Sequence, residues 1–139
     1  MKKTVLFLCT HNSCRSQMAE GLLKKFYGNR FKVFSAGIKA TSVHRLAVIV
    51  MDEIRVDISE HRSKSIYEFK DKNFDYVITV CDNSREKCPF FPGKHILHKD
   101  FEDPGLYEGS YEEKIDRFRI VRDEIREWVG NLVDKEILI

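Results

Sequence analysis

Residues 4–23, TVLFLCTHNSCRSQMAEGLL, join an apolar run typical of a β-strand to a helical pattern through a short polar loop. Cys9 ends the expected strand, and Arg15 follows after five intervening residues, where the helical pattern begins. Buried parallel strands form continuous apolar runs, whereas surface helices repeat their apolar residues with a period of 3.6. The stretch therefore predicts a strand, a loop and a helix, with a thiol at the junction.

The same alternation of strand-like and helix-like segments continues along the chain. The clearest helical pattern is an apolar stripe over 111–129. Strands that alternate with helices are typical of βαβ units around a parallel sheet. We expect one doubly wound α/β domain over residues 1–139, a three-layer structure with a four-stranded parallel sheet flanked by helices. The expected strands are 5–9, 31–35, 76–81 and 95–97, and the expected helices are 16–27, 43–54, 63–69 and 111–129.

Composition limits the function classes. The chain has 139 residues, 42% hydrophobic and 33% charged, which suits one domain with one core. The net charge is +2 with no run of like charges, so we expect no nucleic-acid partner. No stretch approaches the roughly 20 apolar residues that cross a bilayer, and the apolar run at 5–9 is too short for a signal peptide. We expect a cytoplasmic monomer with no membrane contact, whose partner is a small molecule or a protein.

The chain has four cysteines, at positions 9, 14, 81 and 88. Four are too few for a secreted disulfide scaffold, and in a reducing compartment they indicate catalysis, metal binding or burial. Ligands of open α/β sheets bind beyond the carboxyl ends of the strands. Because Cys9 and Cys81 both end expected strands, we expect them at the same rim of the sheet.

The loop after Cys9 has the features of an anion site. Successive amides and a helix N-terminus converge on an anion, and the same field favours the thiolate of Cys9. Arg15 offers a planar fork of donors for a tetrahedral oxyanion, and the Ser16 hydroxyl can donate to the thiolate. The alternative is a buried apolar cysteine and a surface arginine, but their position between a strand and a helix favours the site. The expected oxyanion-binding residues are Thr10, His11, Asn12, Ser13, Cys14 and Arg15.

Residues 9–16, CTHNSCRS, resemble the anion-binding loop of low-molecular-weight protein tyrosine phosphatases and of the thioredoxin-coupled arsenate reductases built on the same fold. The resemblance continues through 35–37, 61–64, 81–88 and Asp103-Pro104, and so covers nearly the whole chain. It implies that family's fold and a general acid at Asp103. Taken alone, Asp-Pro-Gly at 103–105 favours a simple turn, and it is the resemblance that assigns the acid to Asp103.

The resemblance to the reductases also implies a redox triad of Cys9, Cys81 and Cys88. Reducing arsenate takes two electrons, which thiols supply by forming a disulfide that is passed on by exchange. The partners implied are arsenate, phosphate or sulfate as competing anions, and thioredoxin or a similar dithiol protein as reductant. We further expect Arg85 and Lys87 to favour ionised thiols and Ser84 to cap a short helix that loosens when Cys81 and Cys88 pair.

Several other functions remain open. Cys81 and Cys88 can be inert core thiols, but the four cysteines lack the spacing of a zinc site, so we expect no metal. A tyrosine phosphatase that uses Cys9, Arg15 and Asp103 is the main alternative. Gly105-Leu106 stands where such phosphatases carry aromatic residues, although Tyr107 follows. A non-catalytic oxyanion or arsenite sensor is a further alternative.

The last group of predicted residues supports the loop. Some reductases of this family bind potassium at residues that match Asn12, Ser35, Glu20 and an acidic residue, and Lys64 stands at the acidic position. We expect the Lys64 ammonium to replace potassium by pairing with Glu20, and we expect no tightly bound cofactor. Cys14 is expected to pack, and His11 to add a donor to the loop. The other histidines, His44, His61, His95 and His98, are interpreted as structural or surface residues.

Overall fold

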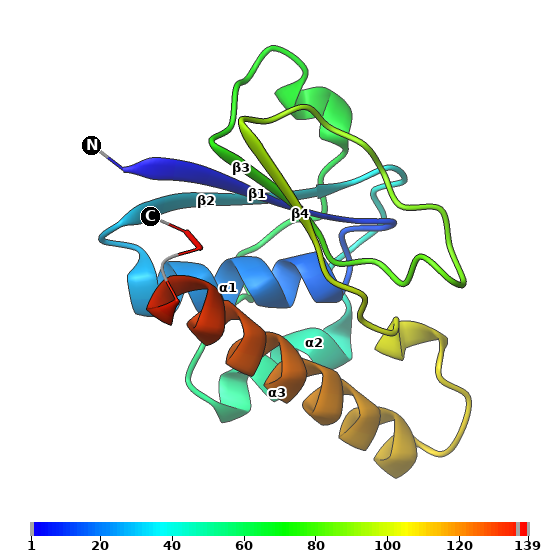
Figure 1. The fold of residues 1–139 in the computed structure, drawn as a ribbon. Helices are drawn as coiled ribbons and strands as arrows, with labels where there is room; N and C mark the ends of the chain where they lie inside the picture. Colours follow the sequence, from blue (N-terminus) through cyan, green and yellow to red (C-terminus); the bar gives the residue numbers. More distant parts are fainter. Residues whose placement is uncertain (1, 136, 139) are drawn as a thin grey trace.

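The computed structural model describes residues 2–135, 137 and 138. Within them, four parallel strands form one sheet in the order β2-β1-β3-β4, as expected. Figure 1 shows β1 and β3 in the middle of this sheet. The strands are β1 (Lys3–Cys9), β2 (Phe31–Gly37), β3 (Tyr76–Thr79) and β4 (His95–His98).

Three α-helices cover one face of the sheet, and a 3-10 helix lies over the other (Figure 1). The predicted three-layer α/β fold is therefore confirmed. No helix in the described part of the chain is long and apolar enough to cross a membrane. The α-helices are α1 (Arg15–Tyr27), α2 (Arg45–Glu53) and α3 (Tyr111–Asp134), and the 3-10 helices are η1 (Ile66–Phe69), on the second face, and η2 (Pro104–Leu106).

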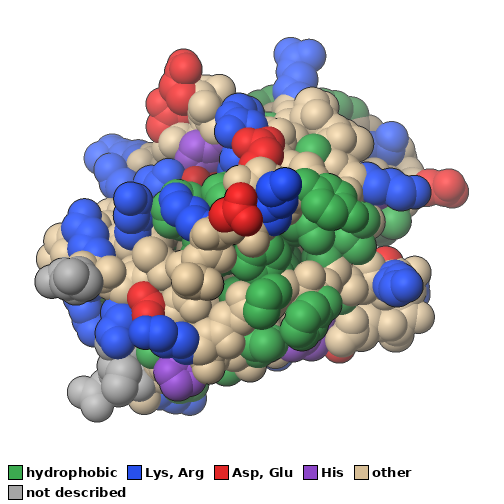
Figure 2. Space-filling model, turned by 90° about the horizontal axis from the view of Figure 1, so that it is seen from above, with side chains coloured by type: hydrophobic (Ala, Val, Ile, Leu, Met, Phe, Trp, Pro, Cys, Tyr) green, Lys and Arg blue, Asp and Glu red, His purple; other side chains and the backbone are tan. Residues whose placement is uncertain are grey.

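Strand β1 is buried on both faces, which explains its unbroken apolar sequence. Val5 and Phe7 belong to the core beneath the α-helices, whereas Leu6 and Leu8 pack into a smaller core on the other face with Phe74. The second face mixes apolar and basic side chains at its surface (Figure 2). The sheet thus separates two apolar layers, and side chains of β1 pack into both of them.

Helix α3 has the apolar stripe predicted from the sequence. Its start is fixed by a capping box in which Ser110 and Glu113 bond to each other's backbone amides. The helix packs mainly on α1 and α2, while Trp128 makes an edge contact with Phe7 of β1, with 6.5 Å between ring centroids. It also extends five residues beyond the predicted end, to Asp134.

Other boundaries differ from the predictions for local reasons. Strand β3 ends at Thr79, so Cys81 lies two residues past the strand rather than in it. Helix α2 begins after His44, because the His44 ring nitrogen accepts the Leu46 amide at 3.0 Å and caps the helix. The helix expected at 63–69 is only the 3-10 turn η1. Cys9 and Cys81 nevertheless follow neighbouring central strands, at one rim of the sheet.

Candidate active site

The loop between β1 and α1 turns its carbonyl groups away from its centre. Because the amide of a trans peptide points opposite to the preceding carbonyl, the amides of residues 11–15 face inward. This is the arrangement expected for an anion cradle. The carbonyls of Thr10, His11, Asn12, Ser13 and Cys14 accept, respectively, from the Lys39 amide, the Ser63 hydroxyl, the Gln17 side chain, the His44 amide and the Met18 amide.

Asn12 holds this loop together from behind. Its φ of 51° lies in the left-handed region, which asparagine tolerates better than most residues. Its buried side chain donates to Ser16 Oγ at 2.7 Å and to Ser35 Oγ at 2.9 Å, and accepts the Lys64 amide at 2.9 Å. The Asn12 side chain therefore ties the loop to α1, β2 and residue 64, while its backbone belongs to the cradle.

Gly37, at the end of β2, lets the loop approach the sheet. A Cβ atom there would lie 2.7 Å from the Thr10 carbonyl oxygen, 2.8 Å from the Asn12 amide nitrogen and 2.9 Å from the Cys9 carbonyl oxygen. All three are backbone atoms, which cannot move aside as a flexible side chain does. The shape of the cradle thus requires a residue without a side chain at position 37.

Gly37→Ala is accordingly expected to lower the free energy of unfolding by about 1–3 kcal/mol and to weaken phosphate binding, because the added methyl group displaces the loop. Thermal unfolding and calorimetric titration with phosphate measure the two effects. Gly130→Ala in α3 is the matched control, since nothing lies within 4 Å of its Cβ position. It is expected to keep or raise stability. Equal behaviour of the two variants would contradict this interpretation.

Cys9 and Ser16 are in direct contact at the centre of the site. Cys9 is buried, and its Sγ lies 2.9 Å from Ser16 Oγ. Since Ser16 Oγ already accepts a hydrogen from Asn12, its own hydroxyl hydrogen is free to be donated to the sulfur. Ser16 is therefore the hydrogen-bond partner of the Cys9 sulfur.

Arg15 is buried, with 2% of its surface exposed. Nη1 donates to the Phe101 carbonyl at 3.1 Å, and Nη2 lies 3.5 Å from Asp103 Oδ2. The Glu86 carboxylate accepts hydrogen bonds from both terminal nitrogens, with Oε2 at 2.5 Å from Nη1 and Oε1 at 2.9 Å from Nη2. Although burial opposes its charge, the contact with Glu86 raises the pKa of Arg15. Nothing in the sequence distinguishes Glu86 from the other charged residues at 82–87, so this contact was not predicted.

The loop encloses a cavity of about 190 Å³. This is smaller than the roughly 300–1,000 Å³ of pockets for drug-sized ligands and suits an inorganic oxyanion. Asp103 stands at its rim, with Oδ1 accepting the Gly105 amide at 2.9 Å. The structure therefore brings Cys9, Arg15 and Asp103 together. The lining residues are Cys9, His11, Ser13, Cys14, Arg15, Thr41, His44, Asp103, Gly105 and Leu106.

His44 caps α2, in keeping with its interpretation as a structural residue, and it also lines this cavity. Burial lowers the pKa of His44, opposed by the charge of Asp103. Tyr107 does not line the cavity. Its ring lies 4.8 Å from the Arg117 guanidinium instead, and the exposed Leu106 forms the rim. The rim thus lacks the aromatic residues that the resemblance associates with phosphotyrosine.

Cys14 also lines the cavity but is held differently from Cys9. It is buried, and its Sγ lies 3.8 Å from Ser13 Oγ. Burial raises the pKa of the Cys14 thiol, and the charge of Asp103 adds to this. Cys14 is therefore a protonated packing thiol in this structure.

Cys88 packs against the core cluster that contains Cys81, and each thiol alters the ionisation of the other. All four cysteines are free thiols. Burial raises the pKa of both Cys81 and Cys88, and Arg15 is the cation that opposes this. The expectation that Arg85 and Lys87 ionise these thiols is wrong. The Arg85 side chain is 84% exposed and lies 3.9 Å from Asp82 instead.

The helix expected between Cys81 and Cys88, capped by Ser84, is also absent from the described chain. Residues 83–85 form a turn, because Asp82 Oδ1 accepts both the amide and the hydroxyl of Ser84. Asp82, rather than Ser84, is the capping residue, which sequence reasoning reversed. No helix has to unwind before the two thiols can pair.

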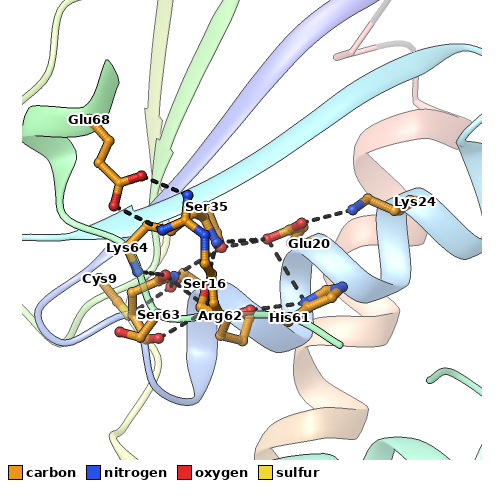
Figure 3. A network of polar contacts seen from close by, with 12 residues as sticks. Cys9, Ser16, Glu20, Lys24, Ser35, His61, Arg62, Ser63, Lys64 and Glu68 are labelled. Atoms are coloured by element: carbon orange, nitrogen blue, oxygen red, sulfur yellow. Dashed lines mark hydrogen bonds and ion pairs between the residues drawn. The ribbon is translucent and has the colours of Figure 1, made fainter. Parts of the chain in front are cut away.

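Glu20 anchors the polar network behind the loop (Figure 3). Ser35 Oγ donates to Glu20 Oε1 at 2.5 Å, and the ammonium groups of Lys24 and Lys64 lie 2.9 and 3.9 Å from the carboxylate. His61 Nδ1 lies 4.0 Å away. Burial opposes ionisation, but the Ser35 hydrogen bond and the nearby cationic groups lower the pKa of Glu20.

The Lys64 ammonium lies inside this network. Lys64 Nζ donates to the Arg62 carbonyl at 2.7 Å and lies beside Glu20, so an ammonium already neutralises the carboxylate. Burial lowers the pKa of Lys64, and Glu20 opposes that effect. Among the described residues, no cluster of three or more His, Cys, Asp or Glu side chains is arranged to hold a metal ion.

The chain is similar to known proteins both in sequence and in structure. A family model described as low molecular weight phosphotyrosine protein phosphatase matches residues 4–138. The chain belongs to this family. A curated relative of this phosphatase-family chain, an arsenate reductase from Halalkalibacterium halodurans, is 49% identical over 125 residues, covering 89% of this chain and 90% of that protein.

Solved structures of arsenate reductases share the fold of this chain. A structure described as an arsenate reductase in the phosphate binding state has a TM-score of 0.81 and 34% identity, covering 96% of this chain and 98% of that chain. A thioredoxin-dependent arsenate reductase from Corynebacterium glutamicum has a TM-score of 0.58 and 30% identity, covering 93% of this chain and 62% of that chain. The resemblance seen in the sequence is therefore confirmed.

Proposed function

We propose that this chain reduces arsenate to arsenite by a relay of Cys9, Cys81 and Cys88, with thioredoxin or a similar dithiol protein as reductant. The observation that carries the proposal is the pair of adjacent free thiols, Cys81 and Cys88, at the rim that also holds Cys9. A phosphatase needs one thiol, whereas reduction by two electrons needs a second thiol to form a disulfide. The names of the relatives agree with this choice.

The first step is attack on arsenate bound in the cavity. The inward amides and Arg15 hold the tetrahedral anion, and the Cys9 thiolate, assisted by Ser16, attacks arsenic. A sulfur–arsenic bond forms, an arsenic–oxygen bond breaks, and the oxygen leaves as water after protonation. We assign to Asp103, at the rim of the cavity, the role of the general acid that supplies that proton.

The second step transfers the electrons. The thiolate of Cys81 attacks Cys9 Sγ, so a Cys9–Cys81 disulfide forms and the electron pair of the sulfur–arsenic bond stays on arsenic as arsenite leaves. The thiolate of Cys88 then attacks Cys81, which frees Cys9 and moves the disulfide to Cys81–Cys88. A dithiol protein reduces this disulfide by two further exchanges and becomes oxidised itself. The thiols thus provide two electrons for each arsenate.

Arsenate-dependent NADPH consumption with thioredoxin and its reductase tests the proposal. We expect steady turnover, with phosphate or sulfate as competitive inhibitors of arsenate. Hydrolysis of p-nitrophenyl phosphate without arsenate reduction would establish a phosphatase instead. Tight binding of arsenate or arsenite without either turnover would establish a sensor.

We also propose that the Lys64 ammonium takes the place of potassium in supporting the loop. Arsenate turnover and thermal stability are expected to be the same in potassium and sodium chloride, within about twofold. Lys64→Ala leaves Glu20 with less neutralisation and is expected to lower the free energy of unfolding by about 1–3 kcal/mol. Turnover and thermal unfolding measured in both salts provide the comparison.

Lys24→Ala is the control for this prediction, because Lys24 also pairs with Glu20 but has a half-exposed side chain. An exposed pair contributes only about 0–1 kcal/mol, so a smaller loss of stability is expected. Marked stimulation of the unmodified chain by potassium over sodium would refute the replacement.

A further inference from the structure

The Glu86 carboxylate connects two parts of the site. It accepts two hydrogen bonds from Arg15 and one from the Thr10 hydroxyl, both residues of the anion loop. It also accepts the Asp82 amide at 3.1 Å, in the turn between Cys81 and Cys88. Burial alone raises the pKa of Glu86, but the hydrogen bonds from Arg15 and Thr10 lower it to about 2. The carboxylate is therefore ionised throughout the neutral range.

Glu86 occupies one edge of the Arg15 guanidinium and leaves another edge without a hydrogen bond. Nη1 uses its two hydrogens on Glu86 and the Phe101 carbonyl, and Nη2 uses one on Glu86, while Asp103 Oδ2 lies 3.5 Å from Nη2. The Nε of Arg15 is buried and has no hydrogen-bond partner among the described residues. A buried donor without a partner is costly, so this edge is suited to a ligand. It consists of Nε and the second Nη2 hydrogen.

Glu86 also lies outside the anion cavity. Cys9 and Arg15 line that cavity, whereas Glu86 lines the neighbouring depression with Thr10 and Asp82. His11, Asp103 and Leu106 border both. A carboxylate that blocked the site would line the same cavity as Cys9. Glu86 thus holds the arginine from its outer edge and leaves the inner edge to the oxyanion.

We propose that Glu86 is a positioning residue for the oxyanion: by binding the outer edge of Arg15, it directs Nε and the second Nη2 hydrogen at the anion above Cys9. The inference rests on the proposed oxyanion reaction and extends it to a residue of the turn between the relay thiols. A planar guanidinium binds a tetrahedral anion through two parallel donors only when its plane is fixed. Glu86 provides that orientation, together with the Phe101 carbonyl.

Calorimetric titration of the reduced protein with inorganic phosphate tests this role without requiring turnover. Glu86→Gln is expected to weaken phosphate binding by about tenfold, because the charged bidentate contact is lost. The direction of this change in phosphate affinity distinguishes positioning from a simple charge effect. Removing a negative charge beside an anion site would by itself strengthen phosphate binding. Glu108→Gln is the matched control, since Glu108 is exposed and lines the same depression, and it is expected to leave binding unchanged or slightly tighter.

A double-mutant cycle with Arg15→Lys separates positioning from general damage to the loop. An ammonium has no plane to orient, so Glu86→Gln is expected not to weaken phosphate binding further in the Arg15→Lys background. The phosphate-dependent shift in the unfolding temperature reports affinity in all four proteins, and their unfolding without phosphate reports the fold. The same tenfold loss in both backgrounds would overturn the inference.

The outcomes distinguish this inference from the proposed function. Phosphate binding that is unchanged or tighter in Glu86→Gln would overturn the positioning role alone and leave the oxyanion site intact. If the unmodified reduced protein bound neither phosphate nor arsenate, the oxyanion site would be refuted, and the inference with it.

Discussion

Cys9→Ser is expected to abolish arsenate turnover, by at least about a thousandfold, while the fold and the anion cavity persist. Serine has nearly the shape of cysteine, but its hydroxyl is a much weaker acid and forms no disulfide. The loss follows from the electron balance as well as from nucleophilicity. Without Cys9, the thiols of Cys81 and Cys88 have no sulfur–arsenic bond to break, so no electron pair reaches arsenic.

The assay for this variant is NADPH consumption with thioredoxin and its reductase, beside phosphate titration as evidence that the cavity is intact. Cys14→Ala is the comparison, because Cys14 lies in the same loop but its thiol is kept protonated by burial. It is expected to retain turnover within about tenfold, the scale of a modest packing defect. Similar losses in Cys9→Ser and Cys14→Ala would contradict the assignment of the nucleophile to Cys9.

The sequence predicted the parts of the site that depend on local pattern. The strand, loop and helix at residues 4–23 follow from apolar periodicity, and the position of Cys9 and Arg15 follows from that local order. The sheet then brings Cys81 to the same rim, because carboxyl ends of parallel strands meet there. The fold class and the partners around Cys9 were therefore predictable from short stretches of chain.

The missed features depend on contacts between distant residues. Glu86 lies 71 residues from Arg15, and a glutamate in a charged stretch has the sequence character of an exposed residue. His44 reaches the cavity because it caps α2, which packing decides. The roles predicted for Ser84 and Arg85 differ from the structure for the same reason, since Asp82 sets the turn at 83–85 and lies 3.9 Å from Arg85. The sequence signal that could have indicated Glu86 is its position between the two relay cysteines, Cys81 and Cys88.

Cys88→Ser is expected to release about one arsenite per chain and then stop, because the last exchange of the relay is missing. Cys9 and Cys81 can still carry out the attack and the electron transfer, so the first turnover remains. The product is a Cys9–Cys81 disulfide, and the nucleophile stays blocked. Arsenite released against protein concentration gives the stoichiometry, and the intact mass without reductant should fall by two hydrogen atoms.

Cys81→Ser provides the contrast that locates each step. With Cys81 replaced, the thiol that attacks Cys9 Sγ in the proposed relay is missing, so we expect the sulfur–arsenic adduct to accumulate and no arsenite to be released in the first turnover. The two variants therefore stop at different chemical species, although both lose steady turnover by at least about a hundredfold. Sustained multiple turnover by Cys88→Ser would instead mean that the external dithiol attacks the Cys9–Cys81 disulfide itself. Cys88 would then have no part in the relay, and its closeness to Cys81 would be a matter of packing.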